Sequence, residues 1–230
     1  MELKPIKTHT KQELFIQEVE KWIFEGKIKP GEKLPSEREM ASKMCISRSV
    51  INRGLQELSR LKLIKINPQS GCVVNNYFQV GNLETLNALL DYQDGNYSQK
   101  LLYSIYDARK LVEKEIIVLA SERCSKVDGA KLNNLIDDFI SSNSGEKGEL
   151  LFKFFHQLAI ISNNQIYPLL ISSFRPVYQI LGKWNSENQG WHKVVSFNRK
   201  LINAIAAHQT DKALQYYSEL VNWSLQDLLR

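Results

Sequence analysis

The sequence predicts a mainly α-helical protein in two parts, an N-terminal winged helix-turn-helix followed by an all-α antiparallel helical bundle. Three observations support this fold class. They are the order of elements in the first third of the chain, the helical periodicity of the rest, and the confinement of excess positive charge to the first third. With 230 residues, the chain is long enough for one large domain or two small ones.

Two helices are predicted at the start of the chain. The spacing of apolar residues indicates a helix over residues 10–25 that stops at Gly26. Its apolar positions are Leu14, Val19, Trp22 and Ile23. A capping box of Ser36 with Glu39 predicts that a second helix begins there and runs to about Met44.

A third helix and a hairpin complete this first part. Ser47 is the expected N-cap of the third helix. The apolar stripe of that helix is Val50, Ile51, Leu55, Leu58 and Leu61. Two short extended segments, 63–66 and 72–74, flank a turn that contains Pro and Gly, which predicts a hairpin. This order is typical of a winged helix-turn-helix, whose third helix enters the DNA major groove while the hairpin lies on the adjacent backbone or minor groove.

The remainder of the chain is predicted to be helical almost throughout. Its periodicity indicates helices over residues 83–91, 97–122, 128–141, 147–162, 164–184, 188–207 and 211–229. We expect Pro176 to kink the fifth of these helices and Thr210 to cap the last. The chain then divides into a winged helix (1–76), a linker with a linker helix (77–96) and a helical domain (97–230).

The net charge of +5 lies entirely in the first third of the chain. Residues 1–78 hold ten Lys and four Arg against nine Glu, whereas residues 79–230 hold sixteen basic and sixteen acidic residues. An excess confined to one segment indicates that this segment binds a polyanion. A solvated lysine-rich face would carry the same charge, so the helix-turn-helix pattern has to decide between the two.

Several other classes of protein are excluded by what the sequence lacks. No window reaches the roughly 18 to 20 apolar residues of a membrane span, and the N-terminus has no apolar signal segment, so we expect a cytosolic protein. Cys45, Cys72 and Cys124 form no CxxC motif and are expected to be reduced. The chain has no P-loop, GxSxG, HExxH or GxGxxG motif, so an enzyme is not expected.

These motifs resemble the GntR family of bacterial transcription regulators. The resemblance of the first part runs through residues 31–38 (GEKLPSER), 46–48 and 55–58 and on to Gly71 and Val74. The second part resembles the all-helical effector domain of the FadR branch through residues 109–113 (RKLVE), 155–156 and 201–206. Its closest likeness is to the members that regulate fatty-acid metabolism in response to acyl-CoA. This implies a ligand-responsive DNA-binding protein.

The resemblance implies DNA contacts at the starts of the second and third helices. Arg38 and Arg48 match the arginines with which the family contacts DNA, and arginine can form paired hydrogen bonds with guanine or phosphate. Ser47 and Ser49 offer hydroxyl and backbone donors to phosphate. The alternative for the two arginines is surface salt bridging.

Two positions depart from the family pattern. Asn52 stands where the family usually has Arg, and because Asn pairs with adenine we expect a shifted operator preference there. Arg53 points about 100° further around the helix and is expected to reach backbone phosphate. At the wing tip Gln69 replaces the family's first Gly, while Ser70 and Gly71 remain small enough for close approach to DNA.

The family's metal site is absent from the sequence. Many relatives bind a metal through one Asp and three His, of which only His156 remains here. Phe152 takes the place of the Asp, while Asn198 and Asn222 take those of the later His residues. We therefore expect no metal and no cofactor. The alternative to a ligand role for His156 is a hydrogen-bonded interior histidine.

The resemblance instead implies an effector with an apolar chain, such as a long-chain acyl-CoA. Arg109, Tyr178, Gly182 and Ser224 match positions near the acyl-CoA site, with Arg109 facing a phosphate or thioester oxygen and Gly182 allowing close approach of the ligand. The full set of expected effector contacts is Arg109, Phe152, His156, Tyr178, Gly182, Asn198, Asn222 and Ser224. Val221 and Leu228 replace a Gly and a Trp of the acyl-CoA-responsive members, and plain core packing would equally explain the aromatic residues here.

The expected function is a homodimeric, ligand-responsive repressor, or dual repressor and activator, of fatty-acid metabolism. It would bind a pseudo-palindromic DNA operator, because a two-fold dimer contacts a two-fold site, and acyl-CoA would release it. One alternative is a regulator of another catabolic pathway that responds to a small organic acid. A second alternative is a helical protein–protein adaptor. No membrane partner is expected.

Overall fold

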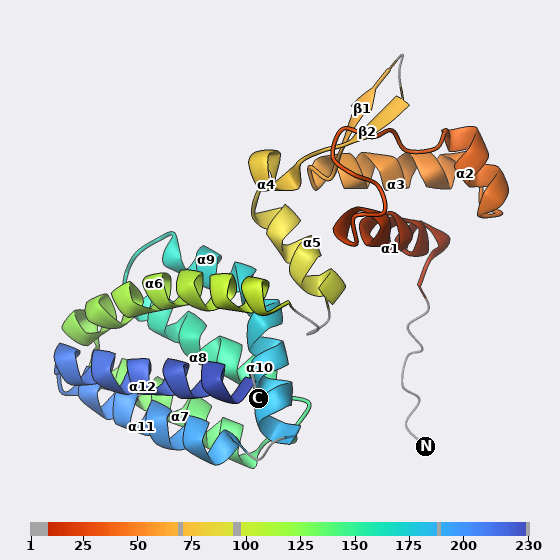
Figure 1. Ribbon diagram of the computed structural model, residues 1–230. Helices are drawn as coiled ribbons and strands as arrows, with labels where there is room; N and C mark the ends of the chain where they lie inside the picture. Colours follow the sequence, from red (N-terminus) through yellow and green to blue (C-terminus); the bar gives the residue numbers. More distant parts are fainter. Residues whose placement is uncertain (1–8, 69–70, 94–97, 188–189, 229–230) are drawn as a thin grey trace, which may run out of the picture. The chain divides into compact units, whose positions relative to one another are not determined.

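The computed structural model describes residues 9–68, 71–93, 98–187 and 190–228. The chain folds as two units, Met1–Gln93 and Asp94–Arg230, whose elements are labelled in Figure 1. No helix among the described residues is long and apolar enough to cross a membrane. The mainly helical fold class predicted from the sequence is confirmed, with a single two-stranded sheet in the described part of the chain.

The first unit is a winged helix-turn-helix followed by two further helices (Figure 1). Its elements are α1 (Lys11–Phe24), α2 (Glu37–Lys43), α3 (Arg48–Arg60), β1 (Ile64–Asn67), β2 (Gly71–Val74), α4 (Tyr77–Val80) and α5 (Leu83–Gln93). β1 pairs antiparallel with β2, so that Ile64 lies opposite Val74 and Asn67 opposite Gly71. The predicted hairpin is therefore confirmed, whereas the short helix α4 was not expected from the periodicity.

Side-chain caps fix where these helices begin. Thr10 and Glu13 form a full capping box at α1, and the Ser47 hydroxyl accepts a hydrogen bond from the backbone N–H of Val50 at the start of α3. The capping box predicted for α2 is only half formed. Ser36 accepts from the backbone N–H of Glu39, but the Glu39 carboxylate pairs with Lys43 at 2.8 Å instead of returning to Ser36.

The core of the first unit is built around α3. The predicted apolar stripe is confirmed at Ile51, Leu55, Leu58 and Leu61, which are buried, whereas its first member, Val50, is only half-buried. On α1 the prediction was wrong at Leu14, which is 51% exposed, because the neighbouring Phe15 fills the core in its place. Other members of this core include Val19, Ile23, Met40, Leu63, Ile64 and Val74.

The second unit is all α-helical in its described residues. Its elements are α6 (Gln99–Arg123), α7 (Lys126–Ser141), α8 (Lys147–Ile161), α9 (Tyr167–Ser173), α10 (Arg175–Glu187), α11 (Trp191–Ala206) and α12 (Thr210–Leu228). α8 packs against α6, α7, α9 and α10, while α11 packs along α12 (Figure 1). The helices thus enclose a common interior that contains the candidate effector site.

Two predicted helix boundaries in this unit were wrong. The helix expected over residues 164–184 is two helices that break at Phe174, and Pro176 lies in the first turn of α10. Proline disrupts a helix interior but is well tolerated in a first turn, where its missing N–H would have no helical partner. Thr210 is the first residue of α12 rather than the residue that precedes and caps it.

Candidate DNA interface and effector cavity

The start of α3 presents a cluster of exposed polar groups on the surface of the first unit. Ser47, Arg48 and Ser49 are all exposed, and the hydroxyl oxygens of the two serines lie 2.9 Å apart. The N-terminus of a helix also carries backbone N–H groups that have no helical partner and attract anions. This arrangement is suited to binding phosphate.

Three of the side chains expected to contact DNA have no partner among the described residues. Arg38, Arg48 and Asn52 are exposed and make no hydrogen bond or ion pair with another described residue. Arg60, near the other end of α3, contrasts with them because it pairs with both Glu57 and Glu84. The alternative that Arg38 and Arg48 serve in surface salt bridges is therefore not supported.

The other residues predicted to contact DNA are Arg53 on α3 and Ser70 and Gly71 at the wing tip. Arg53 is exposed, and its Nε lies 3.4 Å from the carbonyl oxygen of Ser49 on its own helix. Gly71 begins β2 with a φ of +85°, a left-handed conformation that glycine adopts without steric cost, and no atom lies within 4 Å of its absent Cβ. Gln69 and Ser70 lie outside the described residues.

A buried ion pair lies at the centre of the second unit. Arg109 and Glu113, one helical turn apart on α6, are 5% and 0% exposed. Arg109 Nε and Nη2 each lie 2.9 Å from Glu113 Oε1. Tyr178 donates a hydrogen bond to the same oxygen, and Tyr217 donates one of 2.6 Å to Oε2. Helices α6, α10 and α12 are thereby joined by one polar network.

The two phenols in this network remain protonated. Burial raises the pKa of both Tyr178 and Tyr217 well above its usual range, and the neighbouring Glu113 carboxylate raises it further. Each phenol can therefore donate to the carboxylate. The guanidinium of Arg109 lies 4.5 Å above the centre of the Tyr178 ring. Arg109 is thus held by opposite charge and by a cation–π contact together.

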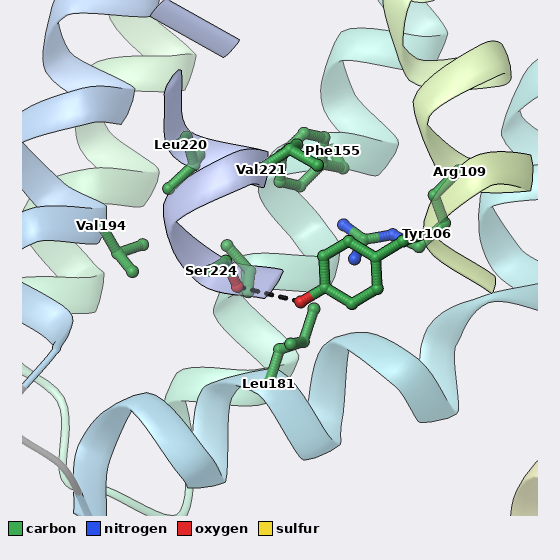
Figure 2. A pocket seen from close by; sticks show the side chains of 9 residues that line it. Tyr106, Arg109, Phe155, Leu181, Val194, Leu220, Val221 and Ser224 are labelled. Carbon is green, nitrogen blue, oxygen red and sulfur yellow. Dashed lines mark hydrogen bonds between the residues drawn. The ribbon is translucent and has the colours of Figure 1, made fainter. Parts of the chain in front are cut away.

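A small cavity of about 30 Å³ lies beside this network (Figure 2). Its walls are formed by Tyr106, Arg109, Leu151, Phe155, Leu181, Val194, Leu220, Val221 and Ser224. Figure 2 shows the hydrogen bond that joins the Tyr106 and Ser224 hydroxyls at 3.0 Å. The cavity is mostly apolar with a polar end, as ligand sites usually are, but it is about one-tenth of the smallest usual ligand pocket.

Of the predicted effector contacts, Arg109 and Ser224 line this cavity, while Tyr178 and Phe152 are buried in the same unit outside its wall. All four are buried, and the Phe152 and Tyr178 rings lie 6.2 Å apart between centroids. Gly182 has a packing contact instead of an open space for a ligand. A Cβ atom there would lie 2.2 Å from the backbone of Gly148, so this pair of glycines lets α10 approach α8 closely.

The other predicted effector contacts differ from one another in burial. Asn222 is exposed and lies 3.5 Å from Lys110, so it points away from the interior. Asn198 is fully buried, and neither its amide oxygen nor its amide nitrogen has a hydrogen-bond partner among the described residues. His156 is half-buried against Phe152, with ring centroids 5.3 Å apart. It makes no hydrogen bond to a described residue, so the hydrogen-bonded interior histidine considered above is not observed.

Tyr106, Glu113 and Tyr217 were missed as parts of this site. A signal for Glu113 was present, because Ile105, Arg109 and Glu113 follow one another at four-residue spacing along an otherwise apolar face. A charged pair on such a face indicates a buried ion pair. No group of three or more His, Cys, Asp or Glu among the described residues could hold a metal ion.

The comparisons with known families cover nearly the whole chain. Residues 12–74 match the family described as bacterial regulatory proteins, gntR family, and residues 75–224 match the FadR C-terminal domain. The chain belongs to the GntR family. It is therefore a DNA-binding transcriptional regulator with a FadR-type C-terminal domain, and the resemblance inferred from the sequence is confirmed.

This GntR-family regulator has several curated relatives at low identity. It is 25% identical to the regulator Mce2R of Mycobacterium tuberculosis, over 100% of this chain and 97% of that protein. It is 25% identical to the galactonate operon transcriptional repressor of Escherichia coli, over 85% and 86%. It is 26% identical to the fatty acid metabolism regulator protein of Proteus mirabilis, over 82% and 77%.

The fold of this regulator also matches a solved structure. The Lar protein, described as controlling the Listeria monocytogenes agr system, aligns with a TM-score of 0.69. The alignment covers 98% of this chain and 99% of that one at 13% identity. A likeness at this identity supports the fold alone, and the transcription-regulator assignment rests on the family matches.

Proposed function

We propose that this regulator is a homodimeric repressor that binds a pseudo-palindromic operator and releases it when an effector enters the helical unit. The observation that carries the DNA part is the group of exposed polar side chains at the starts of α2 and α3. Of these, Arg38, Arg48 and Asn52 make no hydrogen bond or ion pair with another described residue, while Ser47 caps the start of α3 and its hydroxyl bonds to that of Ser49. In this proposal Arg48 and Asn52 contact base edges, while the serines and Arg53 contact phosphates.

The cavity beside Arg109 is the proposed entry point for the effector. At about 30 Å³ it can hold roughly one water molecule, whereas ligand pockets usually measure about 300–1,000 Å³. An organic effector must therefore displace the surrounding helices in order to bind. A ligand that favours the widened state weakens DNA binding by a coupling free energy of about 1–3 kcal/mol.

We favour a long-chain acyl-CoA as the effector and fatty-acid metabolism as the regulated pathway. Two observations support this choice: the relatives named as fatty acid metabolism regulators, and a mostly apolar cavity with a polar end at Arg109, Tyr106 and Ser224. In this proposal the apolar walls receive the acyl chain, and the polar end receives the thioester carbonyl.

The second candidate is a regulator of another pathway that responds to a small organic acid. The relative named as the galactonate operon repressor favours it. The ion pair disfavours it, because Arg109 is already neutralised by Glu113 and offers no free positive charge to an acid.

A protein–protein adaptor would lack the steep salt dependence of DNA binding, about −0.9 in the log–log slope for each neutralised phosphate.

Titration of palmitoyl-CoA against the operator complex tests the effector part directly. The operator is first selected from a random pool of duplexes, and release is followed by fluorescence anisotropy. We expect at least about fivefold weaker DNA binding at saturating palmitoyl-CoA, the lower end of usual coupling, and no change with CoA alone. Unchanged affinity with palmitoyl-CoA would contradict the fatty-acid assignment and leave the family assignment intact.

A further inference from the structure

The wall of the cavity in the helical unit carries no uncompensated charge, even though Arg109 is part of it. Arg109 and Glu113 are almost completely buried and compensate each other. All other walls of the cavity are uncharged. The buried Lys147 is not part of the cavity wall, and its ammonium group donates to the carbonyl oxygens of Phe139 and Ser142. A ligand that enters the cavity therefore meets no uncompensated positive charge in its wall.

The Glu113 carboxylate is firmly held in this position. Its Oε1 accepts from Arg109 and Tyr178, and its Oε2 accepts from Tyr217. If the carboxylate turned away to free Arg109 for an anion, the donors of two buried phenols would lose their acceptor. Buried polar groups without partners are costly, so this rearrangement is disfavoured.

The free energy of binding beside the Arg109–Glu113 pair should differ between an anionic ligand and an uncharged one. A carboxylate or phosphate would lose its water and lie near Glu113, while the guanidinium charge it needs is already compensated. A carbonyl oxygen carries no such penalty. It can accept from guanidinium N–H groups that Glu113 does not engage, because arginine has five donors and Glu113 contacts only Nε and Nη2.

Asn198 supplies a second polar feature in the same unit. It follows Val194, which lines the cavity, by one turn on the same buried face of α11. Its amide oxygen and nitrogen are both buried, and neither has a hydrogen-bond partner in the part of the chain that the structure describes, which is rare in folded proteins. Such a group can exchange hydrogen bonds with an uncharged polar ligand group, but it has no charge with which to compensate a buried ion.

We propose that the effector places an uncharged carbonyl group of the ester, thioester or amide class in this interior, and that Glu113 is the residue that excludes anions. Asn198 lies outside the cavity wall, one turn beyond Val194, and is assigned as a positioning residue that the group reaches when the surrounding helices move apart. The inference rests on the proposed effector site. It adds that the charge state of the buried group, more than its chain, decides which ligands are accepted.

Binding of decanamide and decanoate to the full-length protein tests the inference, since the two probes share a chain and differ in charge at neutral pH. We expect decanamide to bind at least about tenfold more tightly, in line with the penalty for an uncompensated buried charge. Glu113→Gln leaves the Arg109 charge uncompensated. The ratio of the decanamide affinity to the decanoate affinity should therefore shift by about tenfold or more in favour of decanoate. Glu115→Gln, on the exposed face of the same helix, should leave the ratio unchanged.

Several results would overturn the inference. They are equal or tighter binding of decanoate to the wild type, no binding of decanamide, or an unaltered ratio in Glu113→Gln. If Glu113→Gln does not fold, Asn198→Leu takes its place and should weaken decanamide by about tenfold while sparing decanoate, because only the amide loses a partner. A decanamide that binds without releasing the operator would contradict the proposed function and leave the charge preference standing.

Discussion

The arginine side chains of this regulator include some that are exposed without a partner among the described residues and one that is buried and paired. Arg38 and Arg48 are exposed and unengaged, whereas Arg109 is enclosed by a carboxylate and aromatic rings. The same residue type thus serves opposite purposes. An arginine on the surface remains available for DNA, while the buried one fixes the interior of the helical unit.

Tyr217→Phe tests the buried network at the level of one atom. The substitution removes the donor to Glu113 Oε2 and leaves the ring in place. Because a hydrogen bond to a charged group contributes about 1.5–3 kcal/mol, we expect the free energy of unfolding of the helical unit to fall by that amount in urea titrations.

Tyr216→Phe is the matched control for this substitution. Tyr216 is half-buried, and its hydroxyl makes no hydrogen bond to a described residue. We expect a change within about 0.5 kcal/mol, as for most partly exposed substitutions. An equal effect of the two substitutions would show that the Glu113 network adds no stability.

The residues of this network also show which kind of contact could not be predicted from the sequence. Caps such as Ser47 and the stripe at Ile51, Leu55 and Leu58 were predicted, because they depend on neighbours three or four positions away. Glu113, in contrast, meets Tyr178 and Tyr217 from 65 and 104 residues away. One sequence does not reveal such distant pairing.

At the scale of elements, α1, α3 and α5 place three carboxylates near one another. Burial raises the pKa of Glu20 on α1 to about 7, and the nearby charges of Asp91 on α5 and Glu57 on α3 raise it further. Glu57 is itself paired with Arg60, which also pairs with Glu84 on α5. Glu20 therefore titrates near neutral pH where these helices meet.

This raised pKa predicts how stability changes with pH. The folded state binds a proton at Glu20 below a pH of about 7, whereas the unfolded chain binds it only below about 4.5. Stability should therefore rise as the pH falls from about 7 to about 4.5, a gain that Glu20→Gln should remove. A carbon NMR titration of the Glu20 carboxyl should show a midpoint near 7, and a midpoint near 4.5 would contradict this account.

The contact between α8 and α10 depends on two glycines, and Gly182→Ala tests it. The new Cβ would lie 2.2 Å from the Gly148 backbone, so the helices must separate. We expect a loss of about 1–3 kcal/mol in the free energy of unfolding, the usual result of overpacking. Thermal denaturation measures this loss.

Gly129→Ala provides the comparison within the same unit. A Cβ at Gly129 of α7 would meet nothing closer than Ala206 at 3.6 Å, an ordinary contact. Since alanine favours a helix interior by about 0.5–1 kcal/mol over glycine, this variant should be more stable than the wild type. Destabilisation by both substitutions to the same extent would refute the role given to the Gly148–Gly182 contact.

The sequence predicted which segments are helical better than it predicted where one helix ends and the next begins. The sequence predicted α3, the hairpin and most helices of the second unit, because their apolar periodicity is strong. It missed α4, which has no buried residue, and joined α9 to α10 across Phe174. In both cases the apolar pattern alone did not mark where the backbone turns.

At the scale of the whole molecule, the chain combines a DNA-binding unit with a helical unit that contains a small cavity beside a buried ion pair. The gntR-family match over residues 12–74 lies in the first unit, and the FadR C-terminal domain match over residues 75–224 covers most of the second. The positions of Arg38 and Arg48 at exposed helix starts could be predicted from the sequence, because the caps that begin these helices are local. The character of the interior could not, since it depends on distant side chains that meet only in the folded unit.

The central claim, that this regulator holds its operator through the starts of α2 and α3, is tested most directly by an Arg38→Ala/Arg48→Ala double variant. Operator affinity is measured over a range of salt concentrations, with Arg175→Ala as an exposed-arginine control in the other unit. Each lost contact should weaken binding by about 1–3 kcal/mol and make the log–log salt slope shallower by about one unit. Unchanged affinity and slope in the double variant would contradict the claim.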